Sequence, residues 1–513
     1  MTEEAPTAGL SGTADGRGGA HGAVEVLTEQ ERVRREKLER LQAAGVPAFP
    51  VSVPRTTTNA ALRAAHPDLA ADTATAETVS VAGRVMLKRD GGKLCFATIR
   101  DGTGDLQVML SLDRLGQLRL DDWKRDVDLG DHVSVTGEVI SSKRGELSVL
   151  ADSWVLAGKA LRPLPEKWKG LVDEEQRVRR RYVDLIMNPD ARRLVEARAI
   201  VLRSLRSTLD QRGYVEVETP MLQQLHGGAA ARPFATHLNA FDLPMSLRIA
   251  LELWLKRLVV GGIERVYEIG RTFRNEGVDS THSPEFTMLE AYESYGDYDT
   301  MADLTRALVV NAATAVGATT VPASDGTEID LGAPWRTVTV FGAVSEALGT
   351  EVSPDTSADE LRTLAASRDV ALQPGWDAGE IVLELYEQLV EETLVQPTFV
   401  RDYPASVRPL ARPHRDDPRL AEAWDLVVNG VELAPAYSEL VDPVEQRRRL
   451  VEQSVKAAGG DPEAMQLDED FLRALEHGAP PLGGMGLGVD RLLMLLTGVN
   501  IREAITFPLL RPE

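Results

Sequence analysis

Two segments decide the fold: Arg271–Glu290, RTFRNEGVDSTHSPEFTMLE, and Gly484–Leu496, GMGLGVDRLLMLL. Each combines an arginine with either an aromatic ring or a glycine-rich backbone. Arg274 and Arg491 are planar, permanently charged groups that suit a phosphate or a carboxylate. The other side chains that suit contact with a nucleotide here are Glu276, His282 and Phe286. The two segments therefore predict a site that holds a purine nucleotide and stabilises negative charge on its phosphates.

Length and composition limit the class of protein. A chain of 513 residues is too long for one core, so we expect two or three domains. The net charge of −22 argues against a general nucleic-acid binder, although a local basic face stays possible. The single cysteine, Cys95, excludes an internal disulfide and suits a reducing cytoplasm. No apolar run is long enough to span a bilayer, so no membrane association is expected.

The amino-terminal region predicts a tail followed by a helical extension. Residues 1–27 lack the apolar stretch of a signal peptide and are expected to be disordered. Within the extension, 28–77, Thr28 and Glu31 have the spacing of a capping box, and Gly45 would end the helix. This helix carries several cations: Arg32, Arg34, Arg35, Lys37 and Arg40. It is either a solvated charged helix or a basic arm beside an RNA backbone.

Residues 78–160 read as short strands separated by turn signals, the pattern of a five-stranded barrel of the OB type. Such barrels bind single-stranded nucleic acid by stacking bases on exposed rings. Phe96 is the candidate ring, with a plain core phenylalanine as the alternative, and Gln107 and Glu146 are placed to read base edges.

The rest of the chain changes character at a basic, proline-bounded hinge, 161–192. Its arginines are expected to face a polyanion: Arg177, Arg179, Arg180 and Arg181. From Arg193 a long helix is predicted by apolar residues on one face: Leu194, Ala197, Val201, Leu205 and Leu209. Gly213 ends that helix, and a strand closed by Pro220 follows. Residues 317–396 lack chemistry-bearing motifs and read as a helical insertion outside the site.

Taken together, the motifs make the chain resemble the class II aminoacyl-tRNA synthetases, and most closely the lysyl-tRNA synthetases. GYVEVETP resembles the first motif of that class, FRNEG the second and GMGLGVDR the third. Strings such as LKRLVVGG and HSPEFTMLEAY are similar to the lysine enzymes. The resemblance covers the chain from Thr28 onward. It implies an α+β protein in which an OB-fold β-barrel precedes a class II catalytic domain at 193–513, an antiparallel sheet flanked by helices.

The resemblance also implies a reaction and its residues. The expected activity is ATP-dependent conversion of L-lysine to lysyl-adenylate and transfer to tRNA(Lys), by a cytoplasmic homodimer. Arg274 would bridge the substrate carboxylate and the α-phosphate, and Arg491 and Phe286 would sandwich the adenine. The remaining nucleotide contacts would be Glu276, His282 and Glu432. Asp425 and Glu432 would hold Mg²⁺, although the family usually has Glu at position 425. The U-rich anticodon of the tRNA would stack on Phe96.

Lysine selection is expected from two acidic residues, Glu290 and Glu439, assisted by Tyr292 and Tyr437. Paired buried carboxylates repel each other, and a lysine ammonium offsets that cost. The alternative for both residues is an exposed structural charge. By the same resemblance, Glu252 and the Gly228 carbonyl would bind the α-amino group of the substrate.

Two positions depart from the lysine enzymes. Pro435, in PAYSELVDP, replaces an asparagine that helps to hold the substrate carboxylate, and Leu251 replaces a proline next to Glu252. We expect weaker or altered amino-acid affinity with the side-chain preference kept. One alternative is a paralogue that is inhibitor-resistant or uses a lysine analogue. Another is a nucleic-acid-binding regulatory protein without catalysis, which the intact Arg274, Glu432 and Arg491 disfavour.

Overall fold

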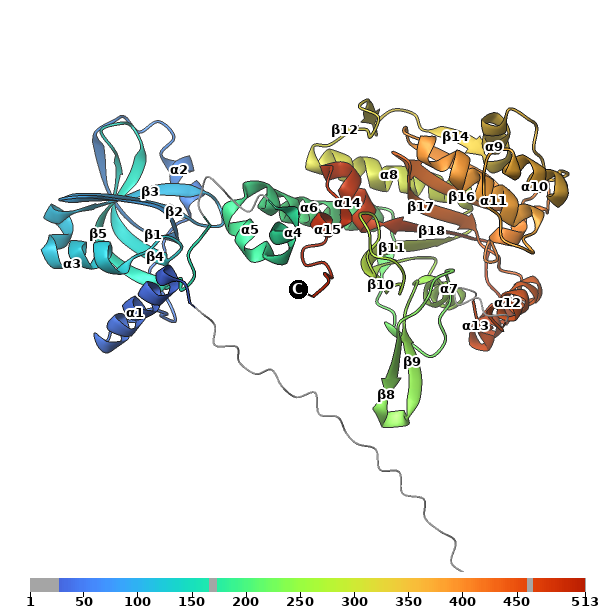
Figure 1. The fold of residues 1–513 in the computed structure, drawn as a ribbon, viewed down its shortest axis with the longest axis horizontal. Helices are drawn as coiled ribbons and strands as arrows, with labels where there is room; N and C mark the ends of the chain where they lie inside the picture. The colour runs from blue at the N-terminus through green and yellow to red at the C-terminus, as the bar shows by residue number, and fades with distance from the viewer. Residues whose placement is uncertain (1–26, 166–172, 459–464, 513) are drawn as a thin grey trace, which may run out of the picture. The chain divides into compact units, whose positions relative to one another are not determined.

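The computed structural model describes residues 27–165, 173–458 and 465–512 (Figure 1). The chain divides into two compact units, Met1–Gly170 and Leu171–Glu513, and the division falls inside the expected hinge 161–192. Nearly all of the tail expected to be disordered, 1–27, lies outside the described residues. In the described part of the chain, no helix has the length and apolar character needed to cross a membrane.

The first unit is built on a closed barrel with strand order β1-β2-β3-β5-β4. Its strands are β1 (Thr73–Gly91), β2 (Leu94–Arg100), β3 (Asp105–Ser111), β4 (His132–Ser141) and β5 (Leu147–Gly158). The predicted five-stranded OB-type barrel is therefore confirmed. Helix α3 (Leu112–Asp126), which joins β3 to β4, was not predicted. Its Trp123 packs edge-on against Trp154 of β5, with ring centroids 5.3 Å apart, and so closes one end of the core.

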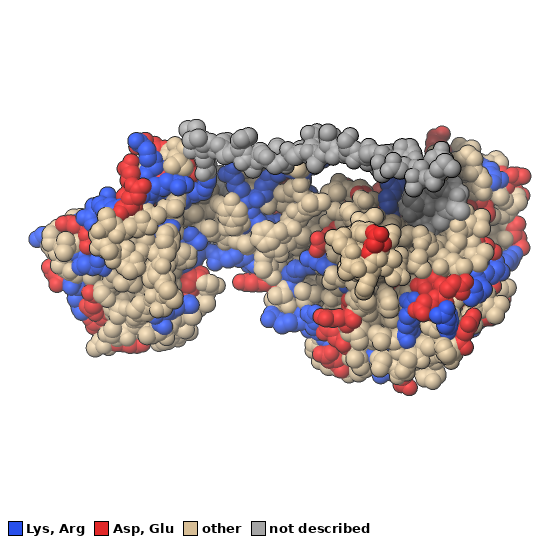
Figure 2. Space-filling view, turned by 90° about the horizontal axis from the view of Figure 1, so that it is seen from below, with Lys and Arg blue, Asp and Glu red and all other residues tan. Residues whose placement is uncertain are grey.

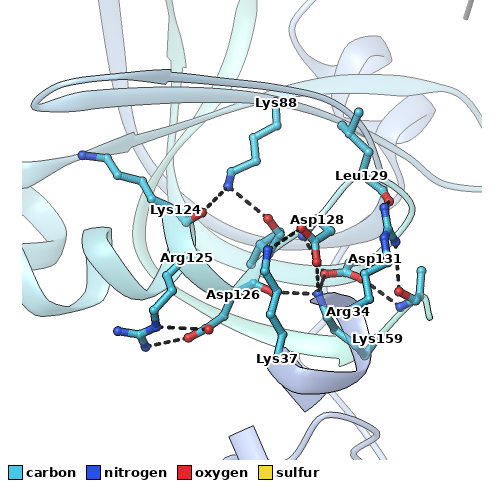
Figure 3. A network of polar contacts seen from close by, with 12 residues as sticks. Arg34, Lys37, Lys88, Lys124, Arg125, Asp126, Asp128, Leu129, Asp131 and Lys159 are labelled. Atoms are coloured by element: carbon cyan, nitrogen blue, oxygen red, sulfur yellow. Dashed lines mark hydrogen bonds and ion pairs between the residues drawn. The ribbon is translucent and has the colours of Figure 1, made fainter. Parts of the chain in front are cut away.

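Helix α1 (Glu29–Ala43) begins at the predicted capping box, in which Thr28 and Glu31 bond each other reciprocally. Two of its five cations are buried or half-buried against the barrel. The Arg34 guanidinium donates to the Leu129 and Ala160 carbonyls at 2.8 and 2.9 Å, and Lys37 pairs with Asp128 at 2.6 Å (Figure 3). Arg34 and Lys37 therefore hold one face of this helix on the barrel, while Arg32, Arg35 and Arg40 are exposed. Helix α2 (Asn59–Ala65) is held to the barrel by the neutral Asn59 amide, which donates to the Ile99 and Gly104 carbonyls.

The second unit contains an eight-stranded sheet with order β14-β15-β16-β17-β18-β11-β10-β6. Its strands are β6 (Val215–Glu216), β10 (Arg265–Phe273), β11 (Glu285–Ser294), β14 (Arg336–Thr339), β15 (Thr398–Pro404), β16 (Leu420–Val428), β17 (Val431–Ser438) and β18 (Leu482–Gly488). All neighbouring pairs are antiparallel except the outer ones, β14 with β15 and β6 with β10. The expected antiparallel sheet is confirmed.

Three helices pack on one face of this sheet, and the site lies on the opposite face, which other helices cover in part. Helices α6 (Pro189–Gln211), α8 (Tyr298–Val316) and α14 (Val489–Thr497) share a core with the sheet (Figure 1). The long helix predicted from Arg193 starts earlier than expected, because Asn188 caps it and Pro189 occupies its first turn. On β11 the residues alternate, with Leu289 and Ala291 in the core and Glu290 on the opposite face.

The remaining elements surround the sheet. The other helices are α4 (Glu174–Arg179), α5 (Arg181–Met187), α7 (Glu252–Val260), α9 (Val340–Leu348), α10 (Ala358–Ala366), α11 (Ala378–Leu389), α12 (Pro443–Ala458), α13 (Glu469–Glu476) and α15 (Ile501–Ala504). The small strands are β7 (Leu222–Gln223), β8 (Ala235–Leu238), β9 (Leu243–Leu247), β12 (Thr320–Pro322) and β13 (Glu328–Asp330). The segment 317–396, expected to be helical, thus also contains the β12–β13 hairpin and contributes β14 to the main sheet.

The basic stripe expected in the hinge is mostly turned inward. Arg181 is buried, pairs with Asp184 at 3.0 Å and donates to carbonyls of the carboxyl-terminal segment. Arg177 also pairs with Asp184, and Arg179 pairs with Glu175 at 2.8 Å. Acidic and basic side chains are interspersed over the faces visible in Figure 2. Hydrogen bonds from Arg179 and Arg181 therefore hold this segment to the carboxyl-terminal residues, and of these four arginines only Arg180 is exposed.

Candidate functional site

A cavity of about 320 Å³ lies on the face of the sheet opposite the helices α6 and α8. Strands β11, β16, β17 and β18 contribute to its walls, as does the segment that follows β10. Every residue expected to bind the nucleotide, lysine or metal lines it: Gly228, Glu252, Arg274, Glu276, His282, Phe286, Glu290, Tyr292, Asp425, Glu432, Tyr437, Glu439 and Arg491. Positions far apart in the sequence are thus brought to one site.

One end of the cavity is strongly acidic. Glu252, Glu290 and Glu439 are 6%, 4% and 2% exposed, so the alternative of surface charges is wrong. Glu290 accepts the Leu251 N–H at 2.9 Å and the Tyr292 hydroxyl at 3.1 Å. Burial raises the pKa of Glu290 to about 7, and the charge of Glu252 adds to the rise. The structure therefore gives Leu251 a role that a proline could not fill, since proline has no N–H.

Lys256 is a buried cation that the sequence reasoning missed. Its Nζ lies 2.5 Å from Glu252 and 2.5 Å from Glu439, and its side chain is 1% exposed. The sequence analysis expected the ammonium of a bound lysine to neutralise Glu439. The structure corrects this expectation, because Lys256 already supplies one counter-ion. Burial still raises the pKa of the Glu439 carboxyl, and Lys256 opposes that rise. The signal was present in the sequence as a Glu–Lys pair four residues apart on one helix.

Gly484 makes room for this acidic end. It lies between Tyr292 on β11 and Tyr437 on β17, as the register partner of both. A Cβ at this position would lie 2.1 Å from Glu439 Oε1 and 2.4 Å from the Tyr292 ring. The glycine is therefore required by the close approach of two side chains and not by a turn.

The other end of the cavity carries fixed cations. Arg274 lies over the Phe286 ring at 5.3 Å, and burial lowers its pKa. Arg491 donates to the Glu432 carbonyl at 2.7 Å and approaches His282 at 3.4 Å. Arg274 thus lies over the Phe286 ring in this structure. The expectation that Phe286 and Arg491 lie on either side of the adenine stays a prediction.

The preceding residue, Asp490, fixes the start of α14 beside these cations. Its Oδ2 accepts the Thr287 N–H of β11 at 2.6 Å, and its Oδ1 pairs with Arg198 of α6 at 2.5 Å. The third motif is therefore tied both to the second motif and to the helical layer.

Between the two ends, Asp425 and Glu432 are the expected metal ligands. Asp425 Oδ2 accepts a hydrogen bond from Arg408 Nη2 at 2.5 Å, while Oδ1 is buried without a hydrogen-bond partner in the described chain. Burial raises the pKa of Asp425 to about 6, although Arg408 lowers it. The described residues contain no group of three or more His, Cys, Asp or Glu that could hold a metal ion alone. The free Asp425 oxygen and the Glu432 carboxylate fit a hard divalent ion that also takes ligands from a nucleotide.

The expected RNA-reading residues lie on the barrel unit. Phe96 is half-buried on the outer face of β2, while its neighbours Cys95 and Ala97 belong to the core. The alternative of a core phenylalanine is therefore wrong. Gln107 donates to the Ser148 hydroxyl at 2.8 Å, and Glu146 pairs with Arg63 at 3.0 Å.

Comparison with known proteins agrees with this arrangement. Residues 173–511 match the model of the class II tRNA synthetases (D, K and N), and residues 79–157 match that of the OB-fold nucleic acid binding domain. The fold and the cavity therefore define a class II aminoacyl-tRNA synthetase.

Individual relatives identify the family within this class. A protein named lysine–tRNA ligase from Kineococcus radiotolerans is 57% identical over 95% of this chain and 98% of that protein. A lysine–tRNA ligase from Mycobacterium bovis is 55% identical over the same shares. The lysylphosphatidylglycerol biosynthesis bifunctional protein LysX of Mycolicibacterium vanbaalenii is 55% identical over 95% of this chain but only 44% of its own length. The chain belongs to the lysine–tRNA ligase family.

Proposed function

We propose that this protein activates L-lysine with ATP and transfers it to tRNA(Lys). The observation that carries the proposal is the charge of the cavity, in which the buried carboxylates of Glu252 and Glu439 share Lys256, while the buried Glu290 carboxylate has no ion-pair partner in the described chain. A guest with two ammonium groups supplies the missing positive charge. The relatives named lysine–tRNA ligase support the same substrate and do not favour a lysine analogue.

Substrate selection follows from that charge. A lysine ε-ammonium has three donors, enough for the Glu290 and Glu439 carboxylates and a tyrosine hydroxyl, Tyr292 or Tyr437. Glu252 and the Gly228 carbonyl, on the neighbouring wall, would take the α-amino group. A neutral amino acid would leave buried carboxylates uncompensated, so discrimination should be strong.

The chemistry requires positioning rather than a nucleophilic side chain. The lysine carboxylate attacks the α-phosphate of ATP, and the new acyl–phosphate bond forms as the bond to pyrophosphate breaks. Arg274 stabilises the charge that develops on the phosphate, and Arg491 and Phe286 hold the adenine. Glu276, His282 and Glu432 complete the nucleotide site. Asp425 and Glu432 would hold Mg²⁺, which supplies further neutralisation of the phosphates when bound.

The remaining elements of the proposal concern RNA, assembly and location. Phe96 would stack on an anticodon base, with Gln107 and Glu146 reading base edges. Exposed apolar side chains near the first motif support a homodimer: Val215, Met221, Leu222, Leu225 and Phe241. Sedimentation velocity would test the dimer. Because tRNA is charged in the cytoplasm, we propose that the protein acts there.

Pyrophosphate exchange across the twenty amino acids tests the proposed function. We expect strong exchange with lysine and little with any neutral amino acid. Strong exchange with a neutral amino acid and none with lysine would overturn the assignment.

A further inference from the structure

Arg408 is a cation of the cavity wall that lies outside all three motifs. It follows a short 3-10 helix, Ala405–Val407, and its guanidinium lies over the Tyr403 ring at 4.1 Å. Its Nη2 donates to Asp425 Oδ2 at 2.5 Å, and its side chain is 19% exposed. The guanidinium is thus held from two sides, stays charged at any physiological pH and still reaches the cavity.

The residue opposite Asp425 on β17 offers no donor to an anion. Pro435 of β17 is the register partner of Asp425 and also lines the cavity. Proline has no backbone N–H and no polar side chain. An anionic group bound at this part of the cavity therefore meets the apolar Pro435 ring on β17 and the Arg408 guanidinium beside β16.

Arg408 contacts Asp425, and the register pair of Asp425 with Pro435 lies between the pairs that contain Tyr437, at the acidic end, and Glu432, at the nucleotide end. Burial raises the pKa of Tyr437, at the acidic end, and the charge of Arg408 opposes that rise. Arg408 also interacts with Glu432, at the nucleotide end. The Nε of Arg408 is buried without a hydrogen-bond partner in the described chain, so its donor capacity is not used up by Asp425.

The carboxylate of the amino acid has to occupy the same intermediate position. Its ammonium groups are drawn to Glu252, Glu290 and Glu439, while its carboxylate must reach the α-phosphate. We propose that the Arg408 guanidinium binds and orients the substrate α-carboxylate, replacing the donor that Pro435 cannot provide. This assignment rests on the proposed function, because it takes lysine as the guest.

The experiment compares two guests that differ only at the proposed contact. L-lysine carries the carboxylate, and L-lysinol has the same two amino groups with a hydroxymethyl group in its place. Binding of each to the full-length protein is measured by calorimetry without ATP, for the wild type and for Arg408→Met. We expect the variant to bind lysine about ten- to a hundredfold more weakly and to bind lysinol as the wild type does.

Further variants separate this contact from a structural effect. Arg408→Met leaves Asp425 without its partner, so Arg408→Met/Asp425→Asn removes both charges and should show the same loss for lysine alone. Arg408→Lys, which keeps the charge, should recover part of the lysine affinity. The ATP affinity of each variant is measured in parallel.

Several results would overturn the proposal. Equal losses for lysine and lysinol would indicate a structural role, and unchanged lysine binding would remove the contact altogether. A loss confined to ATP would assign Arg408 to the phosphates instead. The proposed function fails by a different result, namely a wild-type protein that binds neither guest.

Discussion

The barrel unit and the catalytic cavity both bury charged groups, but they balance them differently. In the barrel, Lys159 has a fully buried side chain and pairs with Asp128 at 2.6 Å and Asp131 at 2.7 Å (Figure 3). Lys37 supplies a second cation to Asp128. Burial alone would raise the pKa of Asp128, but hydrogen bonds from Lys159 and Lys37 hold it below its usual value.

The cavity leaves its charges in excess. Glu252 and Glu439 share the ammonium of Lys256, and Glu290 has no ion-pair partner in the described chain. The pKa of Glu290 is accordingly raised to about 7. A network that only joins α1 to a barrel is balanced within the chain, whereas a network that recognises a cation is left incomplete until that cation binds. Substitutions in the two regions should therefore affect different properties.

The largest effect on activity is expected from Arg274→Ala. This arginine lines the cavity, and in the proposed mechanism it stabilises the charge that develops on the phosphate. Its loss should reduce lysine-dependent pyrophosphate exchange by at least about a hundredfold. The matched control is Arg271→Ala, near the end of β10 just before Arg274, whose side chain pairs with Glu285 on the protein surface. Equal activity in both variants would contradict the role given to Arg274.

Breaking the balanced network should affect stability instead. Lys159→Met leaves Asp131 buried without its partner, and we expect the free energy of unfolding of the barrel unit to fall by about 3–5 kcal/mol. Urea unfolding of the full chain, resolved into its transitions, would measure this loss. Pyrophosphate exchange by the folded protein should stay unchanged. Lys143→Met, at an exposed lysine of the same unit, is the control and should change neither quantity.

The cavity residues could be named from the sequence because its motifs resemble those of the class II synthetases, and strand alternation explains why these residues meet. Glu290 and Tyr292, two residues apart on β11, face the same side, as do Pro435 and Tyr437 on β17. Once the strands pair, these residues converge without further information.

The sequence did not reveal which charges pair across elements. Lys256 pairs with the cavity carboxylates from helix α7, and Arg408 pairs with Asp425 from a loop. Neither residue lies in one of the three class II motifs. The cations of α1 looked like an RNA-binding face, although Arg34 and Lys37 bind the barrel. Composition identifies that a helix is basic, but only tertiary packing decides what its cations contact.

The excess charge of the cavity predicts a pH dependence of lysine binding. Glu290 must be ionised to bind an ammonium, and its pKa of about 7 means that it takes up a proton as the pH falls below neutrality. Lysine affinity should therefore fall between pH 8 and pH 6, approaching a tenfold loss per pH unit on the acidic side. Calorimetry at several pH values would measure this, and Glu290→Gln should flatten the profile while weakening binding.

The same group affects the stability of the lysine-free protein in the opposite sense. The folded state holds the Glu290 proton more tightly than the unfolded chain, whose glutamates titrate near pH 4.3. The resulting stabilisation is complete below that pH and is lost as the pH rises through about 7. The groups facing Glu290 are Glu252, Glu439, Arg274 and Tyr292, of which Glu439 also has a raised pKa and should steepen both profiles. Lysine affinity that is constant from pH 6 to pH 8 would show that Glu290 is not the ammonium partner.

The smallest effect is expected from Phe96→Ala on the barrel. Phe96 lies outside the core, so its loss should leave folding and pyrophosphate exchange intact. Loss of a base stack costs about 1–3 kcal/mol, so the KM for tRNA in the charging reaction should rise about five- to a hundredfold. Phe96→Tyr keeps the ring and should retain charging. If Phe96→Ala lowered lysine activation as much as tRNA charging, the separation between a balanced barrel and a charge-deficient cavity would fail, because a substitution on the outer face of one unit would then act on the chemistry of the other.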